Sequence, residues 1–565
     1  MTEVHRTRDE ELLRKFEKDV LDRDYLNHPF WQFPEEHRLW GLLTAYDSML
    51  TVFAMCPPGS EARADALARE WDDGFVQAVQ WSLGVSDAVR IRPVADRALL
   101  ETSIKFIKYA NGYASIADFH MMYGHGLLKV EVTEDPPRIR FLPHGSVFPD
   151  PEVAGYLQSV KIQEKQSRDR QSRIRAQLSI APPPIANIRY SLSEGRIVIE
   201  NLREIAADDF RNLVDVMSPE EIVPVPDETA LDGFTMGEFR SFWKVLMALS
   251  FCNQVLFLQV ARKGVPQENC AATQFVPRDL FAALQLDLTG LGAETVSRIT
   301  SLLTLGRGIS KPHVFLQPLI CSNDKWLCWC PRLVFRSRYE RNLLKLLARI
   351  PDLAGLAATV VGSRSRPLAS SLGKFLAKYG YQYSIMKKLG PAAKHGDIDL
   401  LAYSKKYPDQ VLLVECKAVL PVDSVNEIAD ATAKMQKGQQ QLRKAIRYLS
   451  EMPTPLKREL CKSVDWSKVR NVYGLVVTPD ADPNSDYDQA EFPATSLVAM
   501  MHLMRMRDIA SPERLCTAAR NMDWVRSMVP AGGIQFRKLV IGNVLYELPV
   551  YRKASDSAEE ANPAD

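Results

Sequence analysis

The chain has 565 residues, which exceeds the length that one hydrophobic core usually supports, so we expect several domains. Its 46% hydrophobic and 25% charged residues are typical of a globular protein and exclude a disordered, collagen-like or coiled-coil chain over most of its length. The 71 Lys and Arg residues nearly balance the 69 Asp and Glu residues. The resulting net charge of +2 neither favours nor excludes a polyanionic partner.

Cysteine spacing and hydropathy indicate the compartment. The nine cysteines are scattered without paired spacing, which favours a reducing cytosol over a disulfide framework. The first twenty residues are charged and helical in pattern, unlike a secretory signal. The longest apolar stretch, 245–261, contains Asn253, Gln254 and Gln259, so a buried helix is favoured over a membrane span. We therefore expect a cytoplasmic protein that has no membrane partner.

The N-terminal third is predicted to be mainly helical. Residues 1–112 form a helical domain, because apolar residues recur there at three- and four-residue steps. Residues 113–186 form a mixed segment with two short strands, a basic helix over 156–178 and a proline-rich linker that begins at 179. Six basic residues against two acidic ones give the 156–178 helix a charge of +4. A solvated helix is favoured there over a nucleic-acid contact.

The next region, residues 187–355, is predicted to be a mixed, mainly helical domain that opens with a β-hairpin. An α/β module follows over 356–505. Beyond it we expect a C-terminal extension over 506–551 and a disordered tail over 552–565, because the tail is small, polar and charged. The whole chain is thus predicted to be an α+β multidomain protein.

The sequence predicts the order of helices and strands in the α/β module. An amphipathic helix ends at Gly380, and three strands follow, the last of them the apolar run VLLVECKAV. A long helix over 424–450 and a final strand that ends before Pro479 complete the order αβββαβ.

Charged residues interrupt the most apolar strand of this module. Side chains alternate faces along a strand, so Glu415 and Lys417 are predicted to lie side by side. The preceding run VLLV is typical of a strand that is covered on both faces. Burial of charge there costs several kcal/mol unless the groups pair or bind a metal.

Two further acids lie on the preceding strand. Asp397 and Asp399 share one face, and pairing through the KKYPDQ turn would bring Asp399 towards Glu415. Oxygens from these two side chains and from the peptide carbonyl of Cys416 suit Mg²⁺, with Asp397 as a further candidate ligand. Lys417 is then expected to position or deprotonate the attacking water, or to neutralise charge on a phosphate.

The string GDIDLLAYSKKYPDQVLLVECK, set in αβββαβ order, resembles the signature of the PD-(D/E)XK nuclease superfamily, which has the restriction-endonuclease-like fold. The resemblance covers about residues 360–480. It implies that Asp399 and Glu415 bind Mg²⁺ or Mn²⁺, and that Lys417 is the catalytic lysine of a DNA endonuclease. The helical region joined to such a module is similar to bacterial genome-defence nucleases. This analogy implies an antiviral function, with a homodimer or a partner defence protein.

Basic charge concentrates on the same module. Residues 361–450 contain fifteen Lys and Arg against seven Asp and Glu, a net charge of +8. These basic residues favour a DNA partner, whose phosphates they would contact. For any single residue, however, a solvated helix face is the stronger interpretation. The candidate nucleic-acid-binding residues are Lys434, Lys437, Gln440, Arg443 and Lys444.

One departure from the family pattern keeps alternatives open. Many superfamily members carry a Glu on the first helix, where this chain offers only Ser370, Ser371 and Lys374. The first alternative is therefore a catalytically inactive nuclease-like module that binds DNA or assembles with a partner. The second is a helical scaffold in which the charges of Asp399, Glu415 and Lys417 only fix a pair of strands.

Other chemistries have no support in the sequence. Cys321, Cys328 and Cys330 lack the second pair that a zinc site needs, so we expect them to pack in the core. The chain has no GxxxxGK[ST], GxGxxG or GxSxG motif, which argues against a phosphate-binding P-loop, a Rossmann cofactor site and a serine hydrolase.

Overall fold

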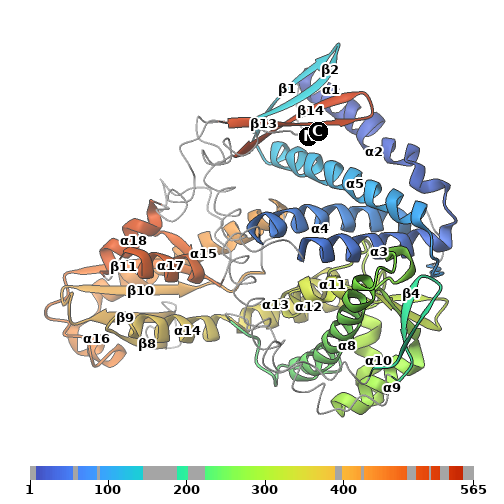
Figure 1. Ribbon diagram of the computed structural model, residues 1–565. Helices are drawn as coiled ribbons and strands as arrows, with labels where there is room; N and C mark the ends of the chain where they lie inside the picture. Colours follow the sequence, from blue (N-terminus) through green and yellow to red (C-terminus); the bar gives the residue numbers. More distant parts are fainter. Residues whose placement is uncertain are drawn as a thin grey trace.

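The computed structural model describes residues 8–54, 61–84, 89–126, 128–143, 188–201, 223–388, 397–420, 425–479, 491–507, 511–521 and 534–551. Over these residues the fold is α+β, as predicted, with many helices and four separate sheets (Figure 1). The predicted basic helix at 156–178, the proline-rich linker and the tail at 552–565 lie outside the described residues.

Three long helices build the N-terminal part. They are α3 (Glu35–Ala54), α4 (Glu61–Gly84) and α5 (Arg97–Gly124), and each contacts the other two. Asp96 begins α5 as its N-cap, where its side chain accepts a hydrogen bond from the Leu99 amide at 3.1 Å. The helix then continues through residue 112, where the sequence predicts a boundary, because a single glycine costs less than the good helix formers around it contribute.

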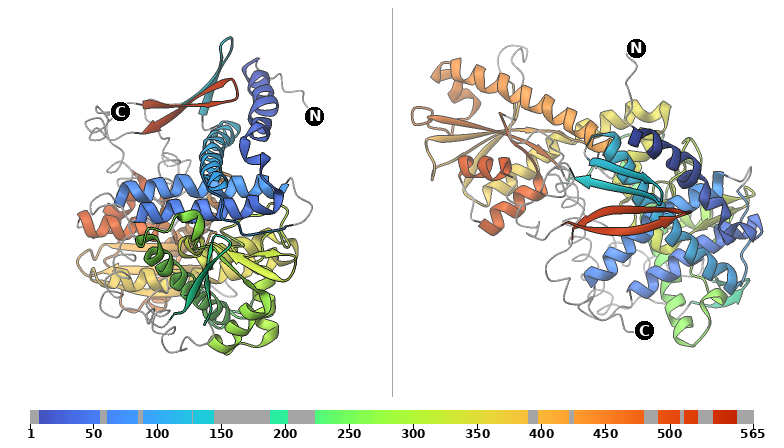
Figure 2. Two further views of the ribbon diagram at one scale, coloured as in Figure 1. Left: turned by 45° about the vertical axis from the view of Figure 1, so that its right-hand side comes forward. Right: turned by 90° about the horizontal axis from the view of Figure 1, so that it is seen from above.

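Residues 128–143 and 534–551, which are far apart in the sequence, share one sheet. Strands β1 (Leu128–Glu134) and β2 (Pro137–Pro143) form a hairpin, and β13 (Ile534–Ile541) and β14 (Val544–Tyr551) form a second one. The order is β1-β2-β14-β13, with β14 parallel to β2. Figure 2 shows this sheet beside α1 (Arg8–Phe16) and α5. Residues 534–551 thus join the N-terminal part of the molecule.

Short helical turns connect α1 to α3. They are η1 (Glu17–Leu21), α2 (Asp22–Asp24), η2 (Tyr25–Asn27) and η3 (Pro29–Gln32).

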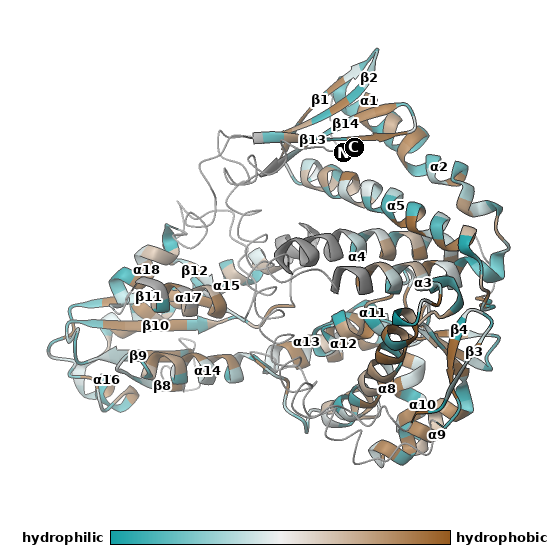
Figure 3. Cartoon of the chain, in the orientation of Figure 1, coloured by the Kyte–Doolittle hydropathy of each residue, from teal (hydrophilic) through white to brown (hydrophobic). Residues whose placement is uncertain are grey.

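The middle of the chain has its own core around α8 (Met236–Arg262), which is mostly hydrophobic (Figure 3). A capping box formed by Thr235 and Glu238 starts this helix. Among the described residues α8 is the one helix long and apolar enough to cross a membrane, but 67% of its most apolar window is buried inside the protein. It therefore has the environment of a core helix, as the sequence predicts for 245–261.

Smaller elements surround α8. The predicted hairpin is present as β3 (Tyr190–Ser193) and β4 (Arg196–Ile199), and a three-stranded sheet has the order β5-β7-β6. The remaining elements of this part are β5 (Gln274–Pro277), β6 (Ile320–Ser322), β7 (Trp326–Trp329), η5 (Gln267–Asn269), α9 (Arg278–Thr289), α10 (Ala293–Leu302), α11 (Pro331–Arg336), α12 (Tyr339–Arg349), η6 (Pro351–Leu353) and α13 (Ala354–Ser363).

The α/β module contains its six predicted elements in the predicted order. They are α14 (Ser365–Ala377), β8 (Tyr381–Lys388), β9 (Asp397–Ser404), β10 (Gln410–Cys416), α15 (Val425–Glu451) and β11 (Asn471–Thr478). The sheet order is β12-β11-β10-β9-β8, with β12 (Ala494–Ser496) at one edge. Strands β8, β9 and β10 are antiparallel, whereas β10, β11 and β12 are parallel.

Helices cover both faces of this sheet. One face packs on α14, α17 (Leu497–Arg507) and α18 (Pro512–Arg520), and the other packs on α15 and α16 (Thr454–Leu460). Every residue of β10 is buried as a result. Because α18 packs on the sheet, the module continues past residue 505, where the sequence predicts that a C-terminal extension begins.

The eight cysteines in the described part of the chain are free thiols. Cys328 and Cys330 are fully buried in the core, as predicted, and Cys321 packs partly buried against the core around α8.

Candidate functional site

The candidate site lies at the carboxyl end of β10, the central strand of the module. Strand β9 runs antiparallel to β10, and Val414 is the register partner of Leu400. Glu415 and Asp399 are the next residues along the two strands beyond this last pair. The two acids that the sequence places on neighbouring strands therefore meet at one end of the sheet.

Asp399 is anchored by the backbone of the next strand. The residue is only 6% exposed, and its Oδ2 accepts a hydrogen bond of 2.7 Å from the Cys416 amide. A buried carboxylate requires such a donor, because an unsatisfied charge in the interior is costly. This bond fixes Asp399 against β10.

Glu415 and Lys417 lie side by side, as the alternation of the strand predicts. Glu415 is 3% exposed, and its Oε1 lies 2.6 Å from Lys417 Nζ. The Lys417 side chain is 18% exposed, and its backbone amide donates to the Val477 carbonyl of β11 at 2.8 Å. The ammonium is thus held on Glu415 while it keeps some access to solvent.

Two residues of α15 complete the surroundings of Lys417, and neither is predicted from the sequence. The Lys417 ammonium also donates to Oε1 of Gln441. A Cβ atom at Gly438 would lie only 3.1 Å from Lys417 Cε and 3.2 Å from Cγ, so glycine leaves the room that this side chain occupies. Gly438 and Gln441 lie three residues apart and therefore on the same side of α15, but no signal in the sequence singles them out.

Burial determines the protonation state of Cys416, which lies between Glu415 and Lys417 in the chain. Desolvation raises the pKa of the Cys416 thiol well above its usual value, and the charges of Asp399 and Glu415 raise it further. Cys416 therefore remains a neutral thiol, and only its backbone carbonyl can serve as a ligand.

The donor set suits a hard divalent cation. Two buried carboxylates and the Cys416 carbonyl supply oxygen ligands of the kind that Mg²⁺ prefers when it keeps several waters. The described residues contain no group of three or more His, Cys, Asp or Glu side chains arranged for a metal. Asp397 starts β9 and pairs in register with Lys388, but its side chain lies outside the described residues. On α14, Ser370, Ser371 and Lys374 add no acid.

The basic residues of α15 are exposed beside this site. The buried face of the helix, which includes Met435 and Leu442, packs on the sheet. At about 100° per residue, Lys434 and Lys437 lie on the same flank as Gln441, and Arg443 lies on the opposite flank. The exposed candidates are Lys434, Lys437, Gln440, Arg443 and Lys444, of which Arg443 pairs with Glu491.

Comparisons of the chain with protein-family models, with curated proteins and with solved structures find no match. Any interpretation of the site therefore depends on the chemistry of its own residues and on the motif in the sequence.

Proposed function

We propose that this protein is a metal-dependent nuclease that hydrolyses phosphodiester bonds of DNA, and that residues from α14 to β11 form a restriction-endonuclease-like catalytic module. One observation carries the proposal. Two buried carboxylates, Asp399 and Glu415, lie on neighbouring strands at the end of the central strand, and Glu415 pairs with the ammonium of Lys417. The mixed sheet and the αβββαβ order of the module support the same assignment.

Each residue has a distinct task in this proposal. Asp399, Glu415 and the Cys416 carbonyl would hold Mg²⁺ or Mn²⁺, and such an ion would supply a Lewis acid that activates water and stabilises charge on the phosphate. Lys417, held between Glu415 and Gln441, orients the attacking water or donates a hydrogen bond to a phosphate oxygen. The Cys416 amide keeps Asp399 in place during the reaction.

The exposed lysines of α15 supply the contact with the substrate in this proposal. Lys434 and Lys437 flank the side of the helix that carries Gln441, where they can bind phosphates next to the reacting bond. We further propose a cytoplasmic function in bacterial genome defence. Cleavage of both strands with one site per chain favours a homodimer, and a partner defence protein is the other candidate for assembly.

The direct test is cleavage by the purified full chain. Supercoiled and linear duplex, single-stranded DNA and RNA are incubated with Mg²⁺ or with EDTA, beside a folded Lys417→Ala control. We expect metal-dependent cutting of DNA that falls by about 10²- to 10⁴-fold in the variant, as for removal of a group that assists proton transfer. Cutting that persists in EDTA, or that is equal in both proteins, would contradict the proposal.

A second candidate function is an inactive nuclease-like module that binds DNA or assembles with a partner. It is favoured by the two-carboxylate donor set and by the lack of an acid on α14. This module would bind DNA equally well with Mg²⁺ and with EDTA, and Lys417→Ala would leave the affinity unchanged. Gel-shift titrations in the two buffers separate it from the nuclease.

A further inference from the structure

Two hydrophobic cores meet at Lys417. We call the cluster around α8, α9, α10, α12 and α13 the helical core, and the cluster between the module sheet and α14, α17 and α18 the sheet core. Cys416 belongs to the sheet core, and Ala418 belongs to the helical core. Leu420 also packs against the helical core. The chain therefore leaves one core and enters the other at the single residue that carries the candidate catalytic ammonium.

The chain passes between the same two cores at two other places. Val223 packs in the sheet core, and Val225 packs in the helical core. Val361 at the end of α13 belongs to the helical core, whereas Leu368 of α14 belongs to the sheet core. Figure 1 shows α13 and α14 following one another at the junction of the two parts.

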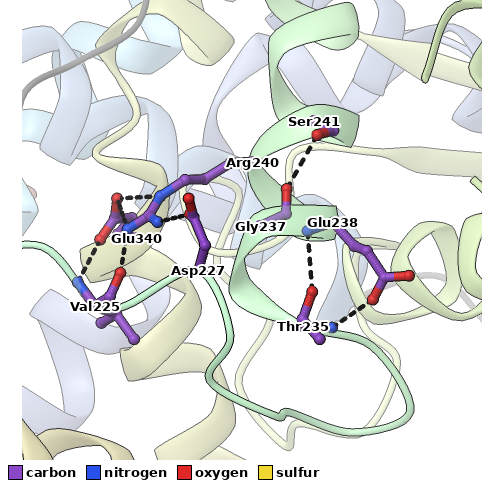
Figure 4. Close-up of polar contacts among 8 residues, drawn as sticks. All are labelled: Val225, Asp227, Thr235, Gly237, Glu238, Arg240, Ser241 and Glu340. Atoms are coloured by element: carbon purple, nitrogen blue, oxygen red, sulfur yellow. Dashed lines mark hydrogen bonds and ion pairs between the residues drawn. The ribbon is translucent and has the colours of Figure 1, made fainter. Parts of the chain in front are cut away.

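Buried polar contacts fix this junction. Arg364, which is 5% exposed and links α13 to α14, donates to the Val223 carbonyl from Nη2 at 2.8 Å and from Nε at 3.2 Å. Val225 lies two residues after Val223, and its amide donates a hydrogen bond to Glu340 Oε2 at 3.2 Å. Arg240 joins Glu340, Asp227 and the Val225 carbonyl in the same network (Figure 4). The segment 223–225 is thus fixed by hydrogen bonds at both of its ends, at Val223 of the sheet core and at Val225 of the helical core.

The backbone of Lys417 is held from both sides. Its amide donates to the Val477 carbonyl in the module, and the next residue, Ala418, belongs to the same helical core as Val360 and Val361 of α13. A shift of the helical core therefore moves Ala418, and close packing transmits that movement to the adjacent residue.

We propose that the helical core positions Lys417 through Ala418 and Leu420, so that residues 236–363 are a working part of the nuclease site. The catalytic meaning of this coupling rests on the proposed nuclease function. Ala418, Leu420 and Val361 are positioning residues in this account, because they act on Lys417 without touching a substrate. Binding of a partner to the helical region would then change the activity through this connection.

The test compares two substitutions of the same type in the full chain. Val361→Ala removes two methyl groups at the junction, and Val296→Ala removes the same groups from α10, elsewhere in the helical core. Amide hydrogen exchange is measured on peptides that cover residues 414–420. We expect exchange there to become about tenfold faster in Val361→Ala than in Val296→Ala, which corresponds to a coupling of about 1.4 kcal/mol. Equal exchange in the two variants would overturn the coupling.

A second variant and a second readout keep the test decisive. Leu420→Ala, on the partly buried side of the same connection, replaces Val361→Ala if that protein does not fold, and is expected to give the same acceleration. In a cleavage assay both junction variants are expected to lower kcat with little change in KM. If exchange responds as expected but no variant and no wild-type protein cleaves DNA, the nuclease proposal fails and the coupling stands. If the wild type cleaves but exchange and kcat match the control, the coupling fails alone.

Discussion

Lys417 is held by a carboxylate and an amide, and this arrangement decides how the site responds to substitution. Glu415 is buried, so the ammonium compensates a charge that cannot be solvated well. Gln441 adds a neutral acceptor, which holds Nζ without adding negative charge. A metal bound at Glu415 and Asp399 would share the first carboxylate with the lysine, so small displacements of Nζ should matter more for activity than for folding.

Gly438→Ala tests this expectation. The new methyl group would meet Cε of Lys417 at 3.1 Å and push the flexible end of that side chain away. We expect the cleavage rate to fall by about tenfold or more, because misplacement of a catalytic group by about 1 Å can cost up to about 10²-fold. Stability should fall slightly, because the methyl group would also lie 3.2 Å from Cγ1 of the buried Val476, although alanine in a helix gains about 0.5–1 kcal/mol over glycine.

Gly112→Ala in the middle of α5 is the matched control. Nothing lies within 4 Å of a Cβ atom at that position. It should stabilise the protein by about 0.5–1 kcal/mol in thermal or urea unfolding and leave cleavage unchanged. Equal activities of the two glycine variants would contradict the role given to Gly438.

Sequence alone predicts part of the site for a simple geometric reason. A strand alternates strictly, so Glu415 and Lys417 had to share a face, and a short turn had to bring Asp399 near them. The contacts from α15 could not be predicted in this way. Which flank of a helix meets a strand depends on how the helix packs in three dimensions, so Gln441 and Gly438 look like any other surface residues in the printed sequence.

Among the elements, α15 divides its surface between the sheet and the solvent. Met435, Leu442, Ala445 and Leu449 are buried on the sheet, whereas the lysines of the helix are exposed. The candidate site lies on one flank of this helix, so only the lysines on that flank can contact a nucleic acid held in the site.

The double variant Lys434→Gln/Lys437→Gln tests the substrate contact. We expect weaker DNA binding and a slope of log K against log salt that is less steep by about 0.9 for each phosphate that the variant no longer neutralises. Fluorescence anisotropy titrations at several salt concentrations provide the measurement.

Lys405→Gln/Lys406→Gln removes the same charge from the turn between β9 and β10. Gln410 and Glu415 stand five positions apart on β10, so this turn is about 17 Å from the site. The control should keep both the affinity and the salt slope of the wild type. If the two double variants bind DNA equally weakly, the lysines contribute to DNA affinity only through the net charge of the protein. In that case α15 is not the contact surface.

Element order was the most predictable level of the fold, and element ends were the least. The αβββαβ order follows from periodicity, turn residues and two long amphipathic helices. Helix α5 passes residue 112 because helix formers on both sides outweigh one glycine. The packing of α18 on the sheet, beyond residue 505, depends on contacts between distant segments that periodicity does not report.

At the scale of the molecule, one sheet joins residues 128–143 to residues 534–551. His120 of α5 packs against this sheet. The centroid of its ring lies 5.3 Å from the ring centroid of Phe141 in β2 and 6.4 Å from that of Tyr546 in β14. Pairing between strands about four hundred residues apart leaves no local signal in the sequence, so this sheet could not be predicted.

The burial of His120 against this sheet predicts a loss of stability in acid. Burial lowers the pKa of His120 to about 4, against 6.5 for an unburied histidine. The unfolded chain therefore binds a proton below pH 6.5 that the folded protein does not accept until about pH 4. The contribution of His120 to the free energy of unfolding is therefore complete above pH 6.5. It falls between pH 6.5 and pH 4, by on the order of 3 kcal/mol in total.

Urea unfolding between about pH 7 and pH 4 measures this effect. His120→Gln cannot take up the proton, so its stability should decline less steeply with falling pH than that of the wild type. His125→Gln, at the exposed end of the same helix, serves as the control and should keep the wild-type decline. Identical pH profiles for all three proteins would contradict the role of His120.

The most direct test of the central claim is binding of Mn²⁺ by the full chain, because it needs neither a substrate nor a partner. Titration followed by electron paramagnetic resonance should show Mn²⁺ bound to the wild type. The affinity should disappear in Asp399→Asn and persist in Asp465→Asn, which alters an acid of the same module whose side chain is 43% exposed. Equal binding in all three proteins, or no binding in any of them, would contradict a metal site at Asp399 and Glu415.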